Sequence, residues 1–201
     1  TNVANTAGQI GDGRFFDGST DLLEITDAAQ SGLTLAGTSF AIGFWNRTQN
    51  TGSNVRNLVT KGAIAGSLGW YVNRTDTNKL RLRLDVTNAD STSNMFINTA
   101  QHCVVMLDSV NAVAWHVFDG VSDSSVAITA AAPALNVNNV VLGQTASSHP
   151  DGWLDEVFVF QRLLTSVHRP LRMTRKYQSR GNFPPWFSSI WMQMASHSSA
   201  E

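Results

Sequence analysis

The stretch Lys79-Leu-Arg-Leu-Arg-Leu-Asp85 decides the fold class of this chain. Its three leucines alternate with charged side chains, which is the period-two pattern of a β-strand that has one buried face and one face in solvent. We therefore expect the leucines to point into a core, and the lysine, both arginines and the aspartate to point outward.

Runs of the same kind, bounded by turn residues, recur over the first 164 positions. In 39–45 the alternation places Phe40, Ile42 and Phe44 on one face. Asp119-Gly120 and Asp151-Gly152 are expected to form turns, because glycine takes positive φ without strain. The other expected strands are 69–72, 102–107, 112–118, 140–143 and 153–162. Many short strands separated by turn signals predict an all-β sandwich or barrel.

The amino-acid composition excludes several classes of protein. Charged residues make up 14% of the 201 residues, against about 25% in an ordinary soluble domain, and the formal net charge is −1. Ser, Thr and Asn together exceed a quarter of the chain, while Lys and Glu, which favour helices, occur only three times each. A helical bundle, a coiled coil and a strongly basic nucleic-acid binder are therefore excluded. Disorder is not expected either, because 42% hydrophobic residues can build a substantial core.

The length suits one sandwich domain followed by a distinct extension. We expect the domain to span 1–164 and the extension 165–201, because the sequence changes character near Leu164. Residues 165–180 hold five basic side chains and no acid. The one cysteine, Cys103, lies in an apolar run and is expected to be a buried small hydrophobe. No stretch approaches the roughly 20 apolar residues that cross a bilayer, so no membrane span is expected.

Six segments follow one another in an order and spacing that cover about residues 8–165. They are Arg14-Phe-Phe-Asp-Gly-Ser-Thr-Asp-Leu-Leu-Glu-Ile25, 39–45, Leu58-Val-Thr-Lys-Gly62, 69–72, Trp115-His-Val-Phe-Asp-Gly-Val121 and Asp151-Gly-Trp-Leu-Asp-Glu-Val-Phe-Val-Phe160. This arrangement resembles the concanavalin A-like jelly-roll superfamily, and within it the laminin-G-like and pentraxin-like domains. The resemblance implies an all-β, two-sheet antiparallel jelly-roll sandwich. It does not settle function, because the superfamily includes lectins, glycanases and purely structural domains.

Four aspartates form the candidate metal site. The resemblance implies that the first and last strands pair, which would bring Asp17 and Asp21 near Asp151 and Asp155. Clustered carboxylates beside the carbonyls of glycine-containing loops suit Ca²⁺, which takes six to eight oxygen ligands. Related domains often carry a structural Ca²⁺ in this neighbourhood, so we predict one here. The alternative is that Asp17 and Asp151 only begin Asp-Gly turns, while Asp155 accepts hydrogen bonds from backbone amides.

Two tryptophans are the candidates for carbohydrate binding, which combines exposed aromatic rings with planar amides. Trp153 and Trp115 have Asn- and Ser-rich loops beside them. Trp153 follows the expected turn at 151–152, so we expect it to be the more exposed. The alternative is that Trp45, Trp70 and Trp115 all pack the sandwich, because large aromatic side chains are more often buried than displayed.

Catalysis is not expected. Glycoside hydrolysis needs two carboxylates roughly 5–10 Å apart across a cleft. Asp155 and Glu156 are adjacent and would face opposite sides of a regular strand, and Asp21 and Glu24 likewise alternate. The five histidines are scattered, without the spacing of a metal-binding or triad-like arrangement.

The C-terminal extension is expected to bind protein. Left free, its apolar side chains would form an exposed patch of the kind that marks interaction sites, and Trp and Met are enriched at interface cores. The side chains expected to contact a partner are Trp186, Phe187, Ile190, Trp191, Met192 and Met194. The alternative is that this tail folds back over one end of its own sandwich.

Together these features predict a non-catalytic jelly-roll module that works by presenting a surface. We expect it on a virion, as a phage capsid or tail decoration, or in an extracellular assembly, where its tail would hold it in a homo-oligomer or a larger particle. The alternative is a lectin-type carbohydrate-binding module of a secreted bacterial protein. Structural Ca²⁺ is the expected cofactor and glycans are the candidate ligands. Nucleic acid is not an expected partner, because the chain is slightly acidic and its basic segment lacks interleaved aromatic side chains.

Overall fold

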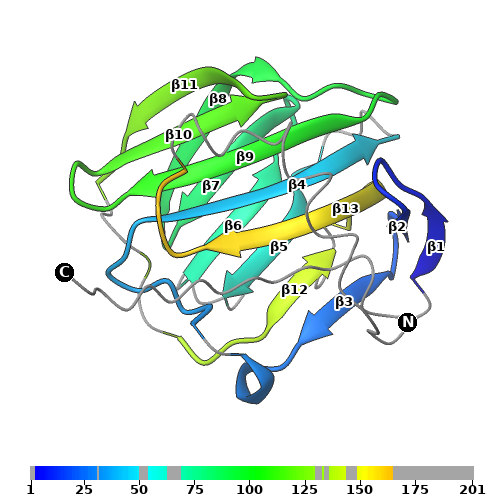
Figure 1. Cartoon of the computed structure of the whole chain (residues 1–201), viewed down its shortest axis with the longest axis horizontal. Coiled ribbons are helices and arrows are strands. Elements are labelled where there is room, and N and C mark those ends of the chain that lie inside the picture. Colours follow the sequence, from blue (N-terminus) through cyan, green and yellow to red (C-terminus); the bar gives the residue numbers. More distant parts are fainter. Residues whose placement is uncertain are drawn as a thin grey trace.

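The computed structural model describes residues 3–30, 32–49, 54–62, 69–129, 133, 136–143 and 149–164. Within these residues the strands form two antiparallel sheets, one of seven strands and one of six, which pack face to face (Figure 1). This confirms the expected all-β, two-sheet sandwich. The extension 165–201 lies outside the described residues, so the expected boundary at Leu164 stays a prediction.

The strand order places the last strand beside the second strand, and the first strand at the edge of the sheet. The seven-stranded sheet contains, in spatial order, β1 (Ala4–Ala7), β2 (Asp12–Asp17), β13 (Asp151–Phe160), β4 (Phe40–Thr48), β9 (Gln101–Asp108), β10 (Val113–Phe118) and β11 (Val121–Ala127). The six-stranded sheet contains β3 (Leu22–Ile25), β12 (Val140–Gly143), β5 (Arg56–Gly62), β6 (Gly69–Arg74), β7 (Lys79–Leu84) and β8 (Thr87–Asn94). A short 3-10 helix, η1 (Asp27–Ala29), follows β3. β13 pairs with β2 and β4, so the expected neighbour of the last strand is the second strand, which contains Asp17, rather than the first.

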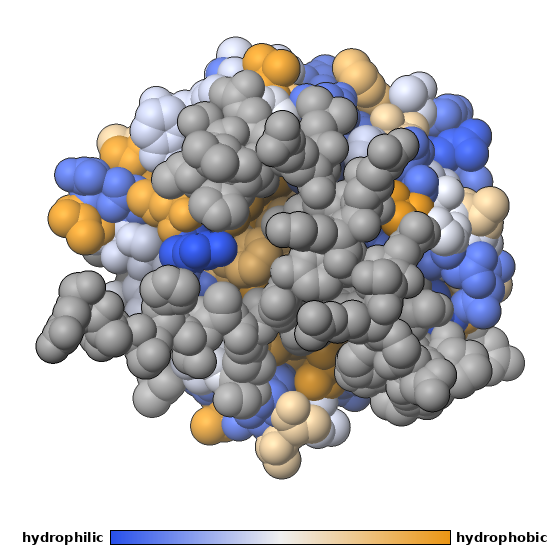
Figure 2. Space-filling model, viewed as in Figure 1, coloured by the Kyte–Doolittle hydropathy of each residue, from blue (hydrophilic) through white to orange (hydrophobic). Residues whose placement is uncertain are grey.

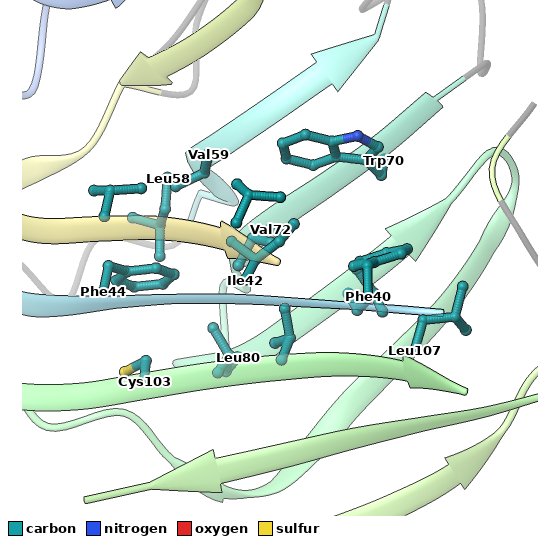
Figure 3. Packing of buried hydrophobic residues seen from close by; sticks show 14 of the residues in the cluster. Phe40, Ile42, Phe44, Leu58, Val59, Trp70, Val72, Leu80, Cys103 and Leu107 are labelled. Carbon is teal, nitrogen blue, oxygen red and sulfur yellow. The ribbon is translucent and has the colours of Figure 1, made fainter. Parts of the chain in front are cut away.

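The core lies between the sheets and follows the alternation of the sequence. On β4, Phe40, Ile42 and Phe44 have no exposed surface, and Figure 3 shows them pointing between the sheets among core side chains of other strands. The three leucines of β7 are equally buried, which confirms the pattern that decides the fold. Cys103 belongs to the same cluster, and burial raises the pKa of its thiol well above the ordinary value. It is therefore the small hydrophobe that the sequence predicts.

One expected turn is confirmed and the other is wrong. Asp119 and Gly120 both have positive φ, 49° and 80°, and join β10 to β11 in a two-residue hairpin turn. Asp151-Gly152 instead lies inside β13. Gly152 has a φ of 138°, and a Cβ there would lie 2.0 Å from the carbonyl oxygen of Arg47. Glycine is needed here because the backbone of β4 lies too close to leave room for a side chain. The chain does not turn at this point.

The residues that the structure describes contain no helix that is long and apolar enough to cross a membrane.

Candidate functional site

The outer face of the six-stranded sheet carries polar side chains in two rows. Trp70, Val72 and the leucines of β7 point into the core, so the residues between them point outward. Strand pairing aligns one row as Thr60, Tyr71, Arg83 and Asn88. It aligns the other as Asn57, Asn73, Arg81 and Asp90. We call these eight side chains the polar face.

Arg81 and Asp90 form a two-pronged ion pair within the polar face. Arg81 Nε lies 2.6 Å from Asp90 Oδ1, and its Nη2 lies 2.8 Å from Oδ2. The hydrogen bonds to Asp90 raise the pKa of the Arg81 guanidinium. Such a bidentate pair holds both planar groups in one orientation, so Arg81 is fixed in direction and its charge is balanced locally.

Arg83 is held differently, against an aromatic ring. Its guanidinium carbon lies 5.4 Å from the centre of the Tyr71 ring, which is a cation–π contact. Its Nε donates to the backbone carbonyl of Asp85 at 2.9 Å. Tyr71 is only 5% exposed, and burial raises the pKa of its hydroxyl, while the charge of Arg83 lowers it and the charge of Asp85 raises it. The ring therefore serves as a platform for the arginine.

Planar amides complete the polar face. Asn73 Nδ2 donates to Asn57 Oδ1 across β5 and β6, while Asn88 is exposed on β8 next to Arg83. Amides, guanidinium groups and a carboxylate offer donors and acceptors in fixed planes. Thr60 and Asn73 are buried, so the half-buried and exposed members of the face are the groups that a ligand could contact. Such groups can bind the adjacent hydroxyls of a sugar ring in pairs.

The outer face of the seven-stranded sheet has the opposite chemistry. Strand pairing places apolar side chains next to one another across β10, β9, β4 and β13. We call this set the apolar face: Trp45, Val104, Met106, Trp115, Val117, Phe158 and Phe160. Figure 2 views the molecule from this side and shows hydrophobic surface in its middle.

Aromatic rings stack on part of the apolar face. His102 lies between Trp45 and Phe158, at centroid distances of 5.2 and 6.1 Å, and Phe158 contacts Phe160 at 5.2 Å. The Phe158 ring covers Gly43, where a Cβ would come within 2.3 Å of it. Burial lowers the pKa of His102 to about 4, so the imidazole in this stack is neutral at pH 7.

The exposure of the two candidate tryptophans is the reverse of the sequence-based expectation. Trp153 is only 6% exposed and lies within β13, opposite Phe15 of β2 and Arg47 of β4, rather than after a turn, so its expected exposure is wrong. Trp115 points outward from β10 and is 38% exposed. Trp70 does pack the core, and its Nε1 donates to the carbonyl of Leu33 at 3.2 Å. Both candidates therefore lie on the seven-stranded sheet, away from the polar face.

The four candidate metal ligands do not all come together. Asp151 pairs with Asp17 in the strand register, and Asp21 Oδ2 accepts the backbone N–H of Asp17 at 3.1 Å. Asp155 lies four residues further along β13, about 13 Å away at the usual rise of a strand. The hydroxyl of Ser19 and the N–H groups of Thr20 and Ser19 hold the pKa of Asp17 well below its usual range.

Within the described residues, no group of three or more His, Cys, Asp or Glu side chains is placed to hold a metal ion. The Asp17 carboxylate instead closes the turn that follows β2, as the alternative interpretation holds. Calcium binding stays a prediction. It requires the melting temperature to rise with Ca²⁺ concentration, and an unchanged melting temperature would count against it.

Asp155 serves a structural purpose. Its Oδ2 accepts the N–H of Ile10 at 2.9 Å, which fastens the turn between β1 and β2 onto β13, and the residue is 1% exposed. Within the described residues its Oδ1 has no hydrogen-bond partner. Burial is the largest cause of its raised pKa. A carboxyl covered in this way is out of reach of a polymeric substrate.

The expectation that Asp155 and Glu156 face opposite sides is incomplete, because β13 is irregular at this point. The register shifts between Asp155 and Phe158, and Glu156 has a φ of 50°. Burial, followed by the nearby Asp155 charge, raises the pKa of Glu156 to about 7. The charge of Asp155 thus acts on Glu156 at the irregular part of the strand.

Sequence patterns identified the outward arginines of β7 but not the site to which they belong. The polar face needs the register of four strands, which brings Tyr71 beside Arg83 and Asp90 beside Arg81. The outward position of Tyr71 between Trp70 and Val72 was a signal that could have found it. The partner-binding side chains expected in 186–194 lie outside the described residues.

Comparison with solved structures identifies folds like this one at low sequence identity. Domain 4 of AbnA, an extracellular arabinanase from Geobacillus stearothermophilus solved with arabinotriose, matches 83% of this chain and 79% of its own, with a TM-score of 0.64 and 14% identity. The Ruminococcus gnavus IT-sialidase CBM40, solved with α2,3-sialyllactose, matches 75% of this chain and 94% of its own, with a TM-score of 0.57 and 13% identity.

The botulinum neurotoxin serotype G binding domain gives a TM-score of 0.64 at 14% identity. The match covers 84% of this chain but only 43% of that domain. At such identities the likeness concerns the fold alone. In sequence, no curated protein matches the chain.

A family match in sequence adds to the shared fold. Residues 17–168, which are more than half of the chain, match Laminin_G_3, described as the concanavalin A-like lectin/glucanases superfamily. This match spans the strands from the end of β2 through β13. The resemblance based on the sequence segments is thereby confirmed: this chain belongs to the concanavalin A-like lectin/glucanases superfamily, as a Laminin_G_3 domain.

Proposed function

We propose that this chain is a non-catalytic carbohydrate-binding module that binds glycans through the polar face. The observation that carries the proposal is the pair of aligned rows on β5 to β8, in which amides, two arginines and a carboxylate are oriented by contacts among themselves. Preoriented polar groups bind hydroxyls at a smaller entropic cost than mobile ones. The site differs from the tryptophans favoured by the sequence, which lie on the other sheet.

The comparisons support a binding module. Two of the similar structures hold an oligosaccharide, arabinotriose in one and sialyllactose in the other, and the neurotoxin match is called a binding domain. Placement outside the cell is part of the proposal, since the arabinanase is described as extracellular. The absence of catalysis is supported by Asp155, whose carboxyl is covered by the turn between β1 and β2.

A glycan array followed by affinity measurement on the best ligand tests this function. Asn88→Ala removes an exposed amide from the polar face and should weaken binding about 2- to 10-fold, the usual value of one hydrogen bond. Asn5→Ala is the matched control, because Asn5 is an exposed asparagine on β1 of the other sheet. Equal effects of the two substitutions, or no binding to any glycan, would contradict the proposal.

The apolar face favours a second candidate function, that of a surface-presenting component of a larger assembly. An outward sheet surface that contains Trp115, Met106 and Val117 resembles an interface core in composition. A virion surface and an extracellular assembly both remain proposals for such a role. The mass and symmetry of the native particle that contains this chain would test it, and a monomer at all concentrations would contradict it.

A further inference from the structure

We propose that the polar face selects glycans that carry a carboxylate group, and that Arg83 is the side chain that binds this group. The inference rests on the proposed function and adds the class of ligand to it. Its basis is a difference between the two neighbouring outward arginines of β7, which point the same way but are held by different partners.

The charge of Arg81 is balanced inside the protein. Both its Nε and its Nη2 bind the carboxylate of Asp90, which is directly opposite on β8. A guanidinium group that is already paired in this bidentate way gains little from a second anion. Arg81 therefore serves as a fixed neighbour in the site, and we do not expect it to be the anion-binding group.

The charge of Arg83 has no carboxylate partner within the described part of the chain. The ion pairs found there are Lys61 with Asp27 and Arg81 with Asp90. The nearest acid in sequence, Asp85, offers Arg83 its backbone carbonyl, while its carboxylate accepts the N–H of Gly69 at 2.7 Å. The side chain of Asp85 is thus engaged by the backbone at the start of β6, and its charge also acts on the Tyr71 hydroxyl.

The orientation of Arg83 leaves the end of its guanidinium group available. The guanidinium group of Arg83 lies over the Tyr71 ring, and the hydrogen bond from Nε restrains the side chain. Neither Nη atom has a hydrogen-bond partner among the described residues. Two parallel N–H groups at the end of a restrained guanidinium match the two oxygens of a carboxylate. The exposed amide of Asn88, opposite Arg83, is placed to bind a neighbouring sugar hydroxyl.

The test uses the full chain and a panel of oligosaccharides built on galacturonate, glucuronate and sialic acid, each paired with its methyl ester. The ester keeps the shape of the sugar and removes its charge. Titration calorimetry should give at least about 10-fold tighter binding of the acid than of its ester, the ratio expected for hydrogen bonds to a charged group. Added salt should weaken binding of the acid and leave the ester nearly unchanged.

Substitutions then assign the preference to Arg83. Arg83→Gln should reduce affinity for the acid about 10-fold or more while changing affinity for the ester less than about 3-fold, and Arg83→Lys should fall between. Arg47→Gln is the matched control, because Arg47 is exposed on β4 and also donates its Nε to a backbone carbonyl, that of Asn98 at 3.1 Å. Thermal unfolding of each variant checks that the fold is kept.

The outcomes separate this inference from the proposed function. Equal affinity for acids and esters, or equal effects of Arg83→Gln and Arg47→Gln, would overturn the inference and leave a glycan-binding module standing. Binding to no glycan at all, neutral or acidic, would overturn both.

Discussion

At the scale of single residues, Lys61 is a charged side chain that the fold has fully enclosed. It has no exposed surface, and its Nζ donates to Asp27 Oδ1 at 2.8 Å, Gln30 Oε1 at 2.7 Å and the carbonyl of Asn138 at 2.6 Å. These bonds tie η1 and the approach to β12 onto β5. All three donors of the ammonium group are used, so its burial is compensated.

Replacing this lysine should therefore be costly. Lys61→Met keeps the length of the side chain but removes three donors. We expect the free energy of unfolding to fall by about 2–4 kcal/mol, because acceptors that Lys61 satisfies are left without a donor. Urea denaturation measures it. Asp27→Asn in the Lys61→Met background should recover part of the loss. A loss below about 0.5 kcal/mol would show that the three contacts do not stabilise the protein.

His116 makes stability depend on pH. It has no exposed surface, its two ring nitrogens lie 3.0 Å from Ser124 Oγ and 3.2 Å from the carbonyl oxygen of Ala89, and burial lowers its pKa to about 4 from 6.5. Between these values the unfolded chain binds the proton and the folded one does not. The contribution of His116 to the free energy of unfolding is therefore fully present above pH 6.5 and falls as the pH drops towards 4.

From pH 7 to pH 5 the expected loss from His116 is about 2 kcal/mol. His116→Gln should remove this share of the pH dependence, although the variant itself is less stable at pH 7. Denaturation at several pH values measures the slope for both proteins. An identical slope in the two proteins would contradict the assignment.

At the scale of elements, Glu156 in the irregular part of β13 makes stability depend on pH in the opposite direction to His116. Burial raises the pKa of Glu156 to about 7, so this carboxyl contributes stability below pH 4.5 and loses it as the pH rises through 7. Glu156→Gln removes the ionised form and should stabilise the protein at pH 8 by roughly 1–3 kcal/mol, with little effect at pH 4.5. Thermal unfolding at both pH values checks this. Greater stabilisation at the acidic pH would have the wrong sign.

Strand alternation predicted individual elements well but could not predict what covers them. The expected strand 140–143 coincides with β12, and the leucines of β7 are buried as their spacing requires. The burial of Trp153 depends on β2 and β4, and the hydrogen bond from Ile10 to Asp155 joins residues 145 positions apart. Such long-range contacts depend on strand order and register, which local patterns do not contain.

At the scale of the whole molecule, the two outer faces of the sandwich differ in chemistry, polar on β5 to β8 and apolar on β10, β9, β4 and β13. This division is not visible in the sequence, because each strand contributes only one or two residues to either face. Periodicity predicted an all-β sandwich or barrel, and the family resemblance implied the two-sheet jelly roll. The candidate site followed only from the pairing of strands that are separate in sequence.

Deletion of residues 183–201 tests whether the C-terminal tail binds a partner or covers its own sandwich. If the tail holds the protein in an assembly, the truncated chain should be a well-folded monomer, because the partner-binding side chains are gone. If the tail covers its own sandwich, truncation should instead reduce solubility by exposing apolar surface. Analytical ultracentrifugation of both chains measures the assembly. A truncated protein with the same number of chains per assembly and the same solubility as the full chain would contradict both.

The most direct measurement is a map of backbone amide chemical shifts of the full chain as its best array glycan is added. If the polar face is the binding site, the shifts should concentrate in β5 to β8, around Thr60, Tyr71, Arg83 and Asn88. Shifts concentrated on the seven-stranded sheet, around Trp115 and Trp45, would contradict the account.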